Sequence, residues 1–297
     1  MTLSIKPVDP VSRPFFGGEV SGIDITRTLT ADEAFGIERG MDQFGVLVFH
    51  GQRFDDEAQL AFSRNFGPLE EASGDLNWGK PRRIESALVN DISNLDADNQ
   101  VLARDNRRRL FSLGNRLWHS DSSFKEVPAK FSLLSARQIP SAGGNTEFAD
   151  MRAAYDSLDA ATKTEIEDLV CEHSQLYSRA LLGFADFTEE DRIRFKPVLQ
   201  RLVRRHPSTG RKSLYLASHA GTIVGWPVPE ARALLRDLIE HATQRQFVYA
   251  HEWQQWDLVM WDNRATMHRA RPFDAREVRD MHRTTVGCER STMAEAA

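Results

Sequence analysis

The sequence predicts a mostly β protein whose strands form a sandwich or barrel, with helices packed on the outside. Strand-like segments dominate from residue 117 onward, and two helical segments, 162–173 and 229–244, interrupt them. Many strands with few helices favour this architecture. A chain of 297 residues can bury a substantial core as one unit, so we expect a single domain over residues 1–297.

The N-terminal third alternates helix and strand. Residues 30–44 begin with a threonine cap followed by acids, which is typical of a helix start. GVLVFHG at 45–51 is a short apolar run between glycines and predicts a buried strand. Residues 55–67 have apolar residues at helical spacing and end in glycine, so they predict a second helix. Residues 71–116 are mostly polar, and we expect a loop region there that serves as a lid or substrate loop.

Further segments of the chain have the composition of strands, with β-branched and aromatic residues between turn residues. They span residues 130–140, 145–151, 198–206, 212–218, 246–253, 257–263 and 281–288.

Composition and charge exclude several classes of protein. The net charge of -5 and the pI of about 6.0 argue against a protein that binds nucleic acid through its phosphates. The basic cluster RDNRRR at 104–109 is typical of a solvated loop. No secretion signal or run of about 18 apolar residues occurs, and the two cysteines form no metal pattern. We therefore expect a cytoplasmic protein with reduced thiols and neither membrane nor nucleic-acid partners.

The stretch LWHSDSSF at 117–124 places a histidine and an aspartate two residues apart. In a strand, side chains change face at every residue, so Leu117, His119 and Asp121 are expected to share one face. With nine histidines in the chain, such a pair alone is weak, because a buried histidine bonded to an aspartate is a common structural arrangement.

A third candidate is His268, which follows the predicted strand 257–263 after a short turn. Two imidazoles and one carboxylate form the facial triad that binds non-haem ferrous iron and leaves positions open for other ligands. Imidazole nitrogen suits divalent iron, and the open positions can hold an oxidisable co-substrate and dioxygen. His119, Asp121 and His268 are therefore the candidate iron ligands.

Two arginines follow His268 with the spacing of one strand face. In RDMHRTTV, Arg279 and Arg283 are expected to point into the same interior. Buried guanidinium groups need carboxylate partners, which the protein or a ligand supplies. Internal salt bridges are one explanation, and an acidic ligand fits the pattern better.

Several motifs together resemble the family of ferrous iron and 2-oxoglutarate dioxygenases that contains taurine dioxygenase and 2,4-dichlorophenoxyacetate dioxygenase. The likeness runs from about residue 45 to about residue 286 and leans toward the dichlorophenoxyacetate branch. It implies a double-stranded β-helix, or jelly roll, in agreement with the predicted strands. The motifs that carry it are GNRLWHSDSSF, GGNTEFADMRAAYD, HATQRQFVY and DLVMWDNRATMHR, with Arg279 and Arg283 downstream.

The resemblance assigns roles to individual residues. It makes His119, Asp121 and His268 the iron ligands, and it places Thr146 and Arg279 at the distal carboxylate of 2-oxoglutarate. Two further residues match positions on the substrate side. These are Asn115 and Arg283, the latter near the acidic end of the substrate. Without the family, Thr146 would be an ordinary strand threonine and Asn115 a residue that bonds its own backbone.

The resemblance also implies a reaction: oxidative decarboxylation of 2-oxoglutarate coupled to hydroxylation of an acidic small molecule by dioxygen. With an aryloxyalkanoic acid such as 2,4-dichlorophenoxyacetate, hydroxylation beside the ether oxygen gives a hemiacetal that collapses to a phenol and glyoxylate. The alternative is a dioxygenase of the same chemistry for a taurine-like sulfonate or another small carboxylate. A sugar- or acid-binding jelly roll without chemistry would leave the triad unexplained.

Some properties stay open at this stage. Residues 70–84 do not align cleanly with the loop that supplies further polar groups to the substrate in relatives, and Lys80, Arg82 and Arg83 in that segment are typical of solvated charges. The natural substrate and its chirality are not fixed. Neither is the number of subunits, with a homo-oligomer among the options.

Overall fold

The computed structural model describes residues 3–72 and 82–295. Within them the chain forms strands with the following bounds: β1 Ser4–Asp9, β2 Arg13–Ser21, β3 Val46–Phe49, β4 Asn90–Asp91, β5 Ala129–Gln138, β6 Thr146–Asp150, β7 Val170–His173, β8 Val198–Arg201, β9 Val203–Arg205, β10 Lys212–Leu214, β11 Ala220–Ile223, β12 Val248–His251, β13 Leu258–Asp262, β14 Thr266–Ala270 and β15 Asp280–Gly287.

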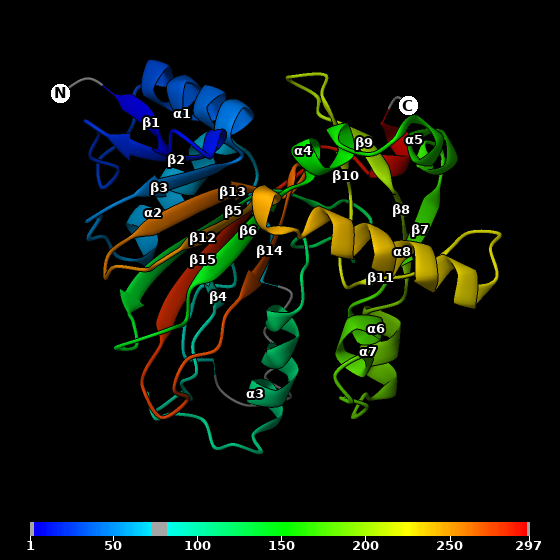
Figure 1. Ribbon diagram of the computed structural model, residues 1–297. Coiled ribbons are helices and arrows are strands. Elements are labelled where there is room, and N and C mark those ends of the chain that lie inside the picture. Colours follow the sequence, from blue (N-terminus) through cyan, green and yellow to red (C-terminus); the bar gives the residue numbers. More distant parts are fainter. Residues whose placement is uncertain (1–2, 73–81, 296–297) are drawn as a thin grey trace.

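Helices lie between and beside these strands (Figure 1). The α-helices are α1 Ala31–Phe44, α2 Asp56–Ser63, α3 Arg107–Ser112, α4 Met151–Asp156, α5 Ala160–Ile166, α6 Gln175–Ala180, α7 Glu189–Arg194 and α8 Val228–Ala242. The short 3₁₀ helices are η1 Arg64–Phe66, η2 Leu113–Arg116, η3 Arg245–Phe247 and η4 Thr292–Ala294.

The main sheet has seven strands in the order β1-β2-β3-β13-β5-β15-β4, and a three-stranded sheet in the order β12-β6-β14 faces it. Strand β3 explains the arrangement, because its side chains alternate between two apolar layers. Leu47 and Phe49 pack with α1 and α2 on the outer face, whereas Val46 and Val48 pack toward Phe148 of the smaller sheet. A strand that is buried on both faces reads as a continuous apolar run, as predicted for residues 45–51.

Helix α1 confirms the prediction for residues 30–44. Thr30 caps the helix through a capping box with Glu33, and Gly45 ends it with a left-handed φ of 67°. Its buried residues Ile37, Met41 and Phe44 cover the outer face of the main sheet. This helix therefore fixes the start of β3, which is hydrogen-bonded to β13.

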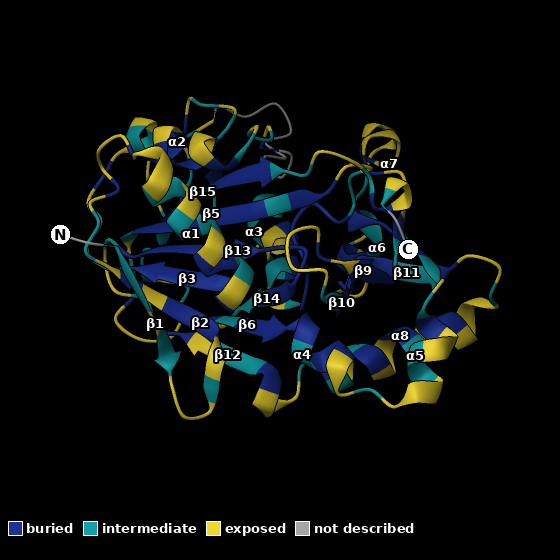
Figure 2. Cartoon of the chain, turned by 90° about the horizontal axis from the view of Figure 1, so that it is seen from above, coloured by how far each residue is buried: buried dark blue, intermediate teal, exposed yellow. Residues whose placement is uncertain are grey.

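A further apolar cluster, apart from the two layers around β3, lies beside the two facing sheets, where Figure 1 shows α5, α8 and the strands β7 to β11. Leu235 and Leu238 of α8 pack there with Ile166 of α5 and Met267 of β14. In Figure 2 the central strands β3, β13 and β5 of the main sheet are mostly buried, whereas β1 and β2 at one edge of that sheet are partly exposed. The observed mixture of sheets and outer helices confirms the predicted mostly β class.

Two predicted elements differ from the structure. Residues 117–124 do not form a strand: His119 makes an isolated bridge to His268, and a turn begins at Asp121, with Ser122 at a φ of 54°. The predicted helix 162–173 ends at Ile166, and Val170–His173 form β7 between β8 and β11. Pairing with two neighbouring strands and burial of Cys171 and His173 override the helical pattern there.

Other elements were not predicted at all. Strands β1 and β2 at the N-terminus and the short helices α6 and α7 carry weak sequence patterns. The predicted loop region 71–116 contains β4, α3 and η2, while its residues 73–81, including Lys80, lie outside the described residues. Arg83 is not solvated as expected, because it forms ion pairs with Asp91 and Asp280. No helix in the described part of the chain is long and apolar enough to span a membrane.

Candidate active site

The predicted iron ligands come together at the edge of the two facing sheets. His268 lies in β14, and its backbone exchanges two hydrogen bonds with His119, of 2.8 and 3.0 Å. Asp121 follows in the turn that leads toward β5. All three side chains are buried, and one potential ligand atom from each lies within 4.8 Å of the others. The turn at Asp121, rather than a shared strand face, brings the carboxylate to the two imidazoles.

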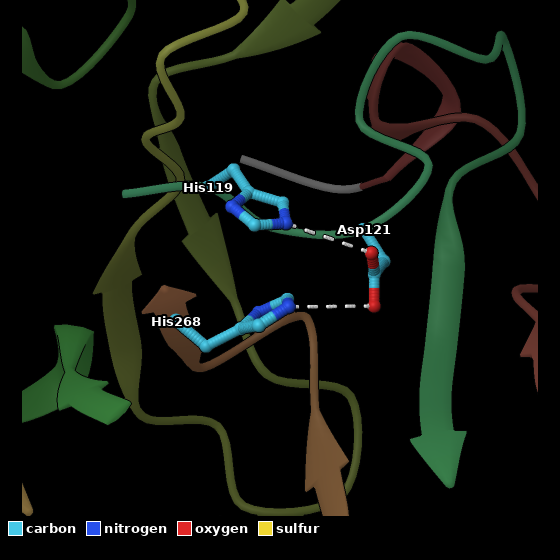
Figure 3. Close-up of side chains that lie close together, drawn as sticks. All are labelled: His119, Asp121 and His268. Carbon is cyan, nitrogen blue, oxygen red and sulfur yellow. Dashed lines mark ion pairs between the residues drawn. The ribbon is translucent and has the colours of Figure 1, made fainter. Parts of the chain in front are cut away.

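The three side chains converge but do not hydrogen-bond to one another (Figure 3). The Asp121 oxygens lie 3.9 Å from His119 Nε2 and 3.7 Å from His268 Nε2. A His–Asp–His cluster around the buried Asp257 behaves differently. Asp257 lies 2.7 Å from His50 Nδ1 and 3.0 Å from His251 Nε2, which are hydrogen-bond distances. The wider spacing around Asp121 fits a cation between the three groups.

The protonation states at the triad also suit a metal. His119 Nδ1 lies 2.7 Å from the Leu117 carbonyl oxygen, which can only accept, so Nδ1 carries the proton and Nε2 presents its lone pair toward Asp121. Burial lowers the pKa of both His119 and His268, which keeps the imidazoles neutral. Burial raises the pKa of Asp121, but the Arg283 guanidinium, helped by the hydrogen bond from Ser132, outweighs it and holds that pKa well below its usual range. Neutral imidazoles with an ionised carboxylate are the forms that bind divalent metals.

Asp121 is oriented by a buried polar network that sequence reasoning missed. Ser132 Oγ donates to Asp121 Oδ2 at 2.7 Å, and Asn263 Nδ2 donates to Ser132 Oγ at 2.9 Å. Asn263 Oδ1 accepts from the Asp121 backbone at 3.0 Å and from Trp261 Nε1 at 3.1 Å. The polar DN pair that ends the strand segment DLVMWDN was the only signal for Asn263 in the sequence.

Replacing Asn263 by leucine should weaken both the fold and metal binding. The change leaves two buried N–H donors without acceptors, which costs about 2 kcal/mol or more in the free energy of unfolding. Because Asp121 is no longer held in place, Mn(II) affinity measured by calorimetry should fall roughly 10- to 100-fold. Ser213→Ala is the control, since Ser213 is buried and donates only to the Arg264 carbonyl. Unchanged Mn(II) affinity in Asn263→Leu would contradict this orienting role.

A cavity of about 150 Å³ opens beside the triad, and Arg279 and Thr146 line it together. Arg279 precedes β15, is buried, and makes one long hydrogen bond of 3.5 Å to the Gly144 carbonyl. It has no carboxylate partner among the residues that the structure describes. Burial lowers its pKa to about 10, and it remains charged at neutral pH. Thr146 begins β6 and accepts a hydrogen bond from Trp253 Nε1 at 3.0 Å.

The two predicted substrate-side residues reach the same region. Arg283 of β15 lines the cavity with Arg279, as predicted, and its Nη1 donates to Asp121 Oδ1 at 2.5 Å. The protein therefore supplies one carboxylate partner for Arg283, whereas its Nε has none. Asn115 lies in η2 and lines the cavity close to His119. All seven predicted site residues are thus brought to one place.

Residues 4–285 match the family described as taurine catabolism dioxygenase TauD, TfdA family. The chain belongs to this family. Relatives of this chain include the α-ketoglutarate-dependent 2,4-dichlorophenoxyacetate dioxygenase of Cupriavidus pinatubonensis, which is 47% identical over 92% of this chain and 94% of the relative. The (S)-phenoxypropionate/α-ketoglutarate dioxygenase of Sphingobium herbicidovorans is 36% identical over 93% and 92%.

A solved structure gives the same result. This chain is similar to the protein in the crystal structure of AAD-2 in complex with Mn(II) and N-oxalylglycine. The two sequences are 57% identical, and the structures superpose with a TM-score of 0.94 over 98% of this chain and 100% of the other. Membership of the TauD, TfdA family confirms the predicted enzyme class, a dioxygenase that uses ferrous iron, 2-oxoglutarate and dioxygen. It also confirms that the reaction partner is a small molecule.

Proposed function

We propose that the protein hydroxylates an aryloxyalkanoic acid such as 2,4-dichlorophenoxyacetate, with ferrous iron, 2-oxoglutarate and dioxygen, and yields the phenol, glyoxylate, succinate and carbon dioxide. The observation that carries this proposal is the buried triad of His119, Asp121 and His268 beside Arg279, a buried cation without an acidic partner among the described residues. The names of the 47% and 36% identical relatives support the substrate class.

Individual residues have distinct roles in this proposal. His119, Asp121 and His268 hold the iron, which when bound supplies the oxidation of a carbon–hydrogen bond by dioxygen. Arg279 and Thr146 hold the distal carboxylate of 2-oxoglutarate, because a buried guanidinium fork and a hydroxyl match a carboxylate. Arg283 and Asn115 contact the acidic substrate. These groups position one carbon–hydrogen bond and keep others away from the oxidant.

The finer description of the fold belongs to the same proposal. The main sheet and the facing sheet β12-β6-β14 are proposed as the two halves of a double-stranded β-helix, or jelly roll, within a single domain of residues 1–297. The segment 71–116 is proposed as its lid or substrate loop. The cytoplasmic location, the homo-oligomer and the absence of nucleic-acid and membrane partners stay predictions.

The alternative substrate is a taurine-like sulfonate or another small carboxylate. Apolar side chains in the cavity favour an aromatic substrate over a small polar one, because a ring needs apolar walls. Ile92, Leu102, Trp261 and Phe273 supply such walls. A panel of phenoxyacetates, phenoxypropionates, cinnamates and sulfonates, scored by succinate release, tests the proposal. Phenoxyacetates should give the highest turnover, and a preference for taurine would favour the alternative.

A further inference from the structure

A second, smaller chamber meets the triad from the side of the short helices. It has a volume of about 60 Å³ and shares Asn115, His119 and Arg283 with the first cavity. Its remaining walls include Phe111 of α3 and Arg179 of α6. No predicted role, for iron or for 2-oxoglutarate, uses Arg179.

Arg179 is a buried cation without an acidic partner in residues 3–72 and 82–295. The residue is 4% exposed. Nη1 donates to Ser178 Oγ at 3.0 Å, Nη2 donates to Asn115 Oδ1 at 3.4 Å, and the buried Nε has no hydrogen-bond partner. Burial lowers its pKa to about 10, so the guanidinium is still charged at neutral pH.

The other buried arginines show that this arrangement is unusual within the chain. Arg152, Arg204 and Arg264 are each paired with a carboxylate, from Asp150, Glu295 and Asp262 respectively. In the part of the chain that the structure describes, Arg279 and Arg179 are the buried arginines that lack such a pair. Each of the two lines a chamber beside the triad. A buried, unneutralised cation is costly, and an anionic ligand removes that cost.

The surroundings hold the Arg179 guanidinium in one orientation. Its Cζ lies 4.6 Å from the centre of the Phe111 ring, a cation–π distance. The group also lies directly against Gly114, where an added Cβ would come within 2.3 Å of Arg179 Cζ. Ser178 Oγ donates to the Gln175 carbonyl, so it accepts from Arg179 Nη1 and from His219 Nδ1. The guanidinium is thus fixed before any ligand arrives.

We propose that Arg179 receives the carboxylate of the acidic substrate in this second chamber, from α6, while Arg283 approaches from β15. This inference rests on the proposed function in requiring an acidic substrate, but it does not depend on which acid it is. Arg283 already donates to the Asp121 carboxylate, whereas Arg179 donates to Ser178 and Asn115 and to no carboxylate among the described residues. The aromatic part of the substrate then extends into the first cavity, which shares Asn115, His119 and Arg283 with this chamber. Arg179 is therefore a specificity-determining residue.

The test measures binding to enzyme loaded with Mn(II) and N-oxalylglycine, with the best acid of the substrate panel and its neutral amide as probes. Arg179→Leu should weaken binding of the acid about tenfold or more, since a charge-assisted pair is lost. It should leave the affinities for Mn(II) and 2-oxoglutarate close to wild type. The preference for the acid over the amide should therefore collapse.

Two further variants separate recognition from folding. Gly114→Ala keeps the charge of Arg179 but displaces its guanidinium, so it should also weaken binding of the acid. Arg232→Leu is the matched control. Arg232 of α8 lies over the ring of Tyr177, which is in α6 with Arg179, but Arg232 is exposed and lines neither chamber. It should bind the acid normally.

Several results would overturn the inference. They are unchanged acid affinity in Arg179→Leu, an equal loss for acid and amide, and a wild-type enzyme that takes only neutral substrates. A wild-type preference for sulfonates would instead contradict the proposed function, and Arg179 would then be tested with the preferred sulfonate and its neutral sulfonamide.

Discussion

Asp121→Ala is expected to abolish iron-dependent release of succinate while leaving the protein folded. The carboxylate is the only anionic group of the triad, and its removal leaves two neutral imidazoles, which bind ferrous iron far more weakly. The fold should survive because the two sheets and their apolar layers, rather than the metal, hold the chain together. Mn(II) calorimetry and thermal denaturation measure the two effects separately.

A second buried aspartate provides the control for this experiment. Asp257 also lies between two histidines, but it is hydrogen-bonded to His50 and His251 directly. Asp257→Ala should lower the free energy of unfolding by about 1–3 kcal/mol, since buried groups lose their partner. Its turnover per folded molecule should remain close to wild type. An active Asp121→Ala enzyme would refute the assignment of the triad.

Arg279→Lys should weaken the apparent affinity for 2-oxoglutarate by more than about tenfold, or roughly 1.4 kcal/mol. Lysine keeps the positive charge but loses the planar fork that pairs with both oxygens of a carboxylate. Arg279 has no protein carboxylate that could share its charge among the described residues, so its pairing capacity is left for a ligand. Titration of 2-oxoglutarate against succinate release measures the effect.

Arg269→Lys is the control for Arg279→Lys. Arg269 follows the candidate iron ligand His268, but its guanidinium pairs with Glu147 and lies over Trp118, outside the first cavity. It should keep the wild-type affinity for 2-oxoglutarate. Equal affinities in wild type and Arg279→Lys would move the co-substrate role to another residue.

The sequence was sufficient to predict which residues gather at the triad, although it predicted the wrong local structure for one of them. Residue types and spacing singled out His119, Asp121 and His268, and the structure places them together. The predicted strand at 117–124 was wrong because Ser122 adopts a left-handed conformation, and alternation of side chains cannot reveal such a turn.

Contacts between distant segments were harder to predict. Arg179 contacts Asn115 and Phe111, which lie more than 60 residues away in the sequence. No local sequence pattern identifies an arginine that lacks an acidic partner in the folded chain. Strand β7 was misread as helix for a similar reason. Its two neighbouring strands, rather than its own residues, decide its conformation.

Two walls of the second chamber, Phe111 and Arg179, belong to a different part of the architecture from the iron ligands. His119 and His268 are tied by their own backbone bridge at the edge of the sheets, whereas Phe111 and Arg179 stand on α3 and α6, outside all four sheets. Directed evolution can exploit this separation. Libraries confined to residues 107–112 and 175–180 should change which acid is accepted while the oxidising centre keeps its geometry.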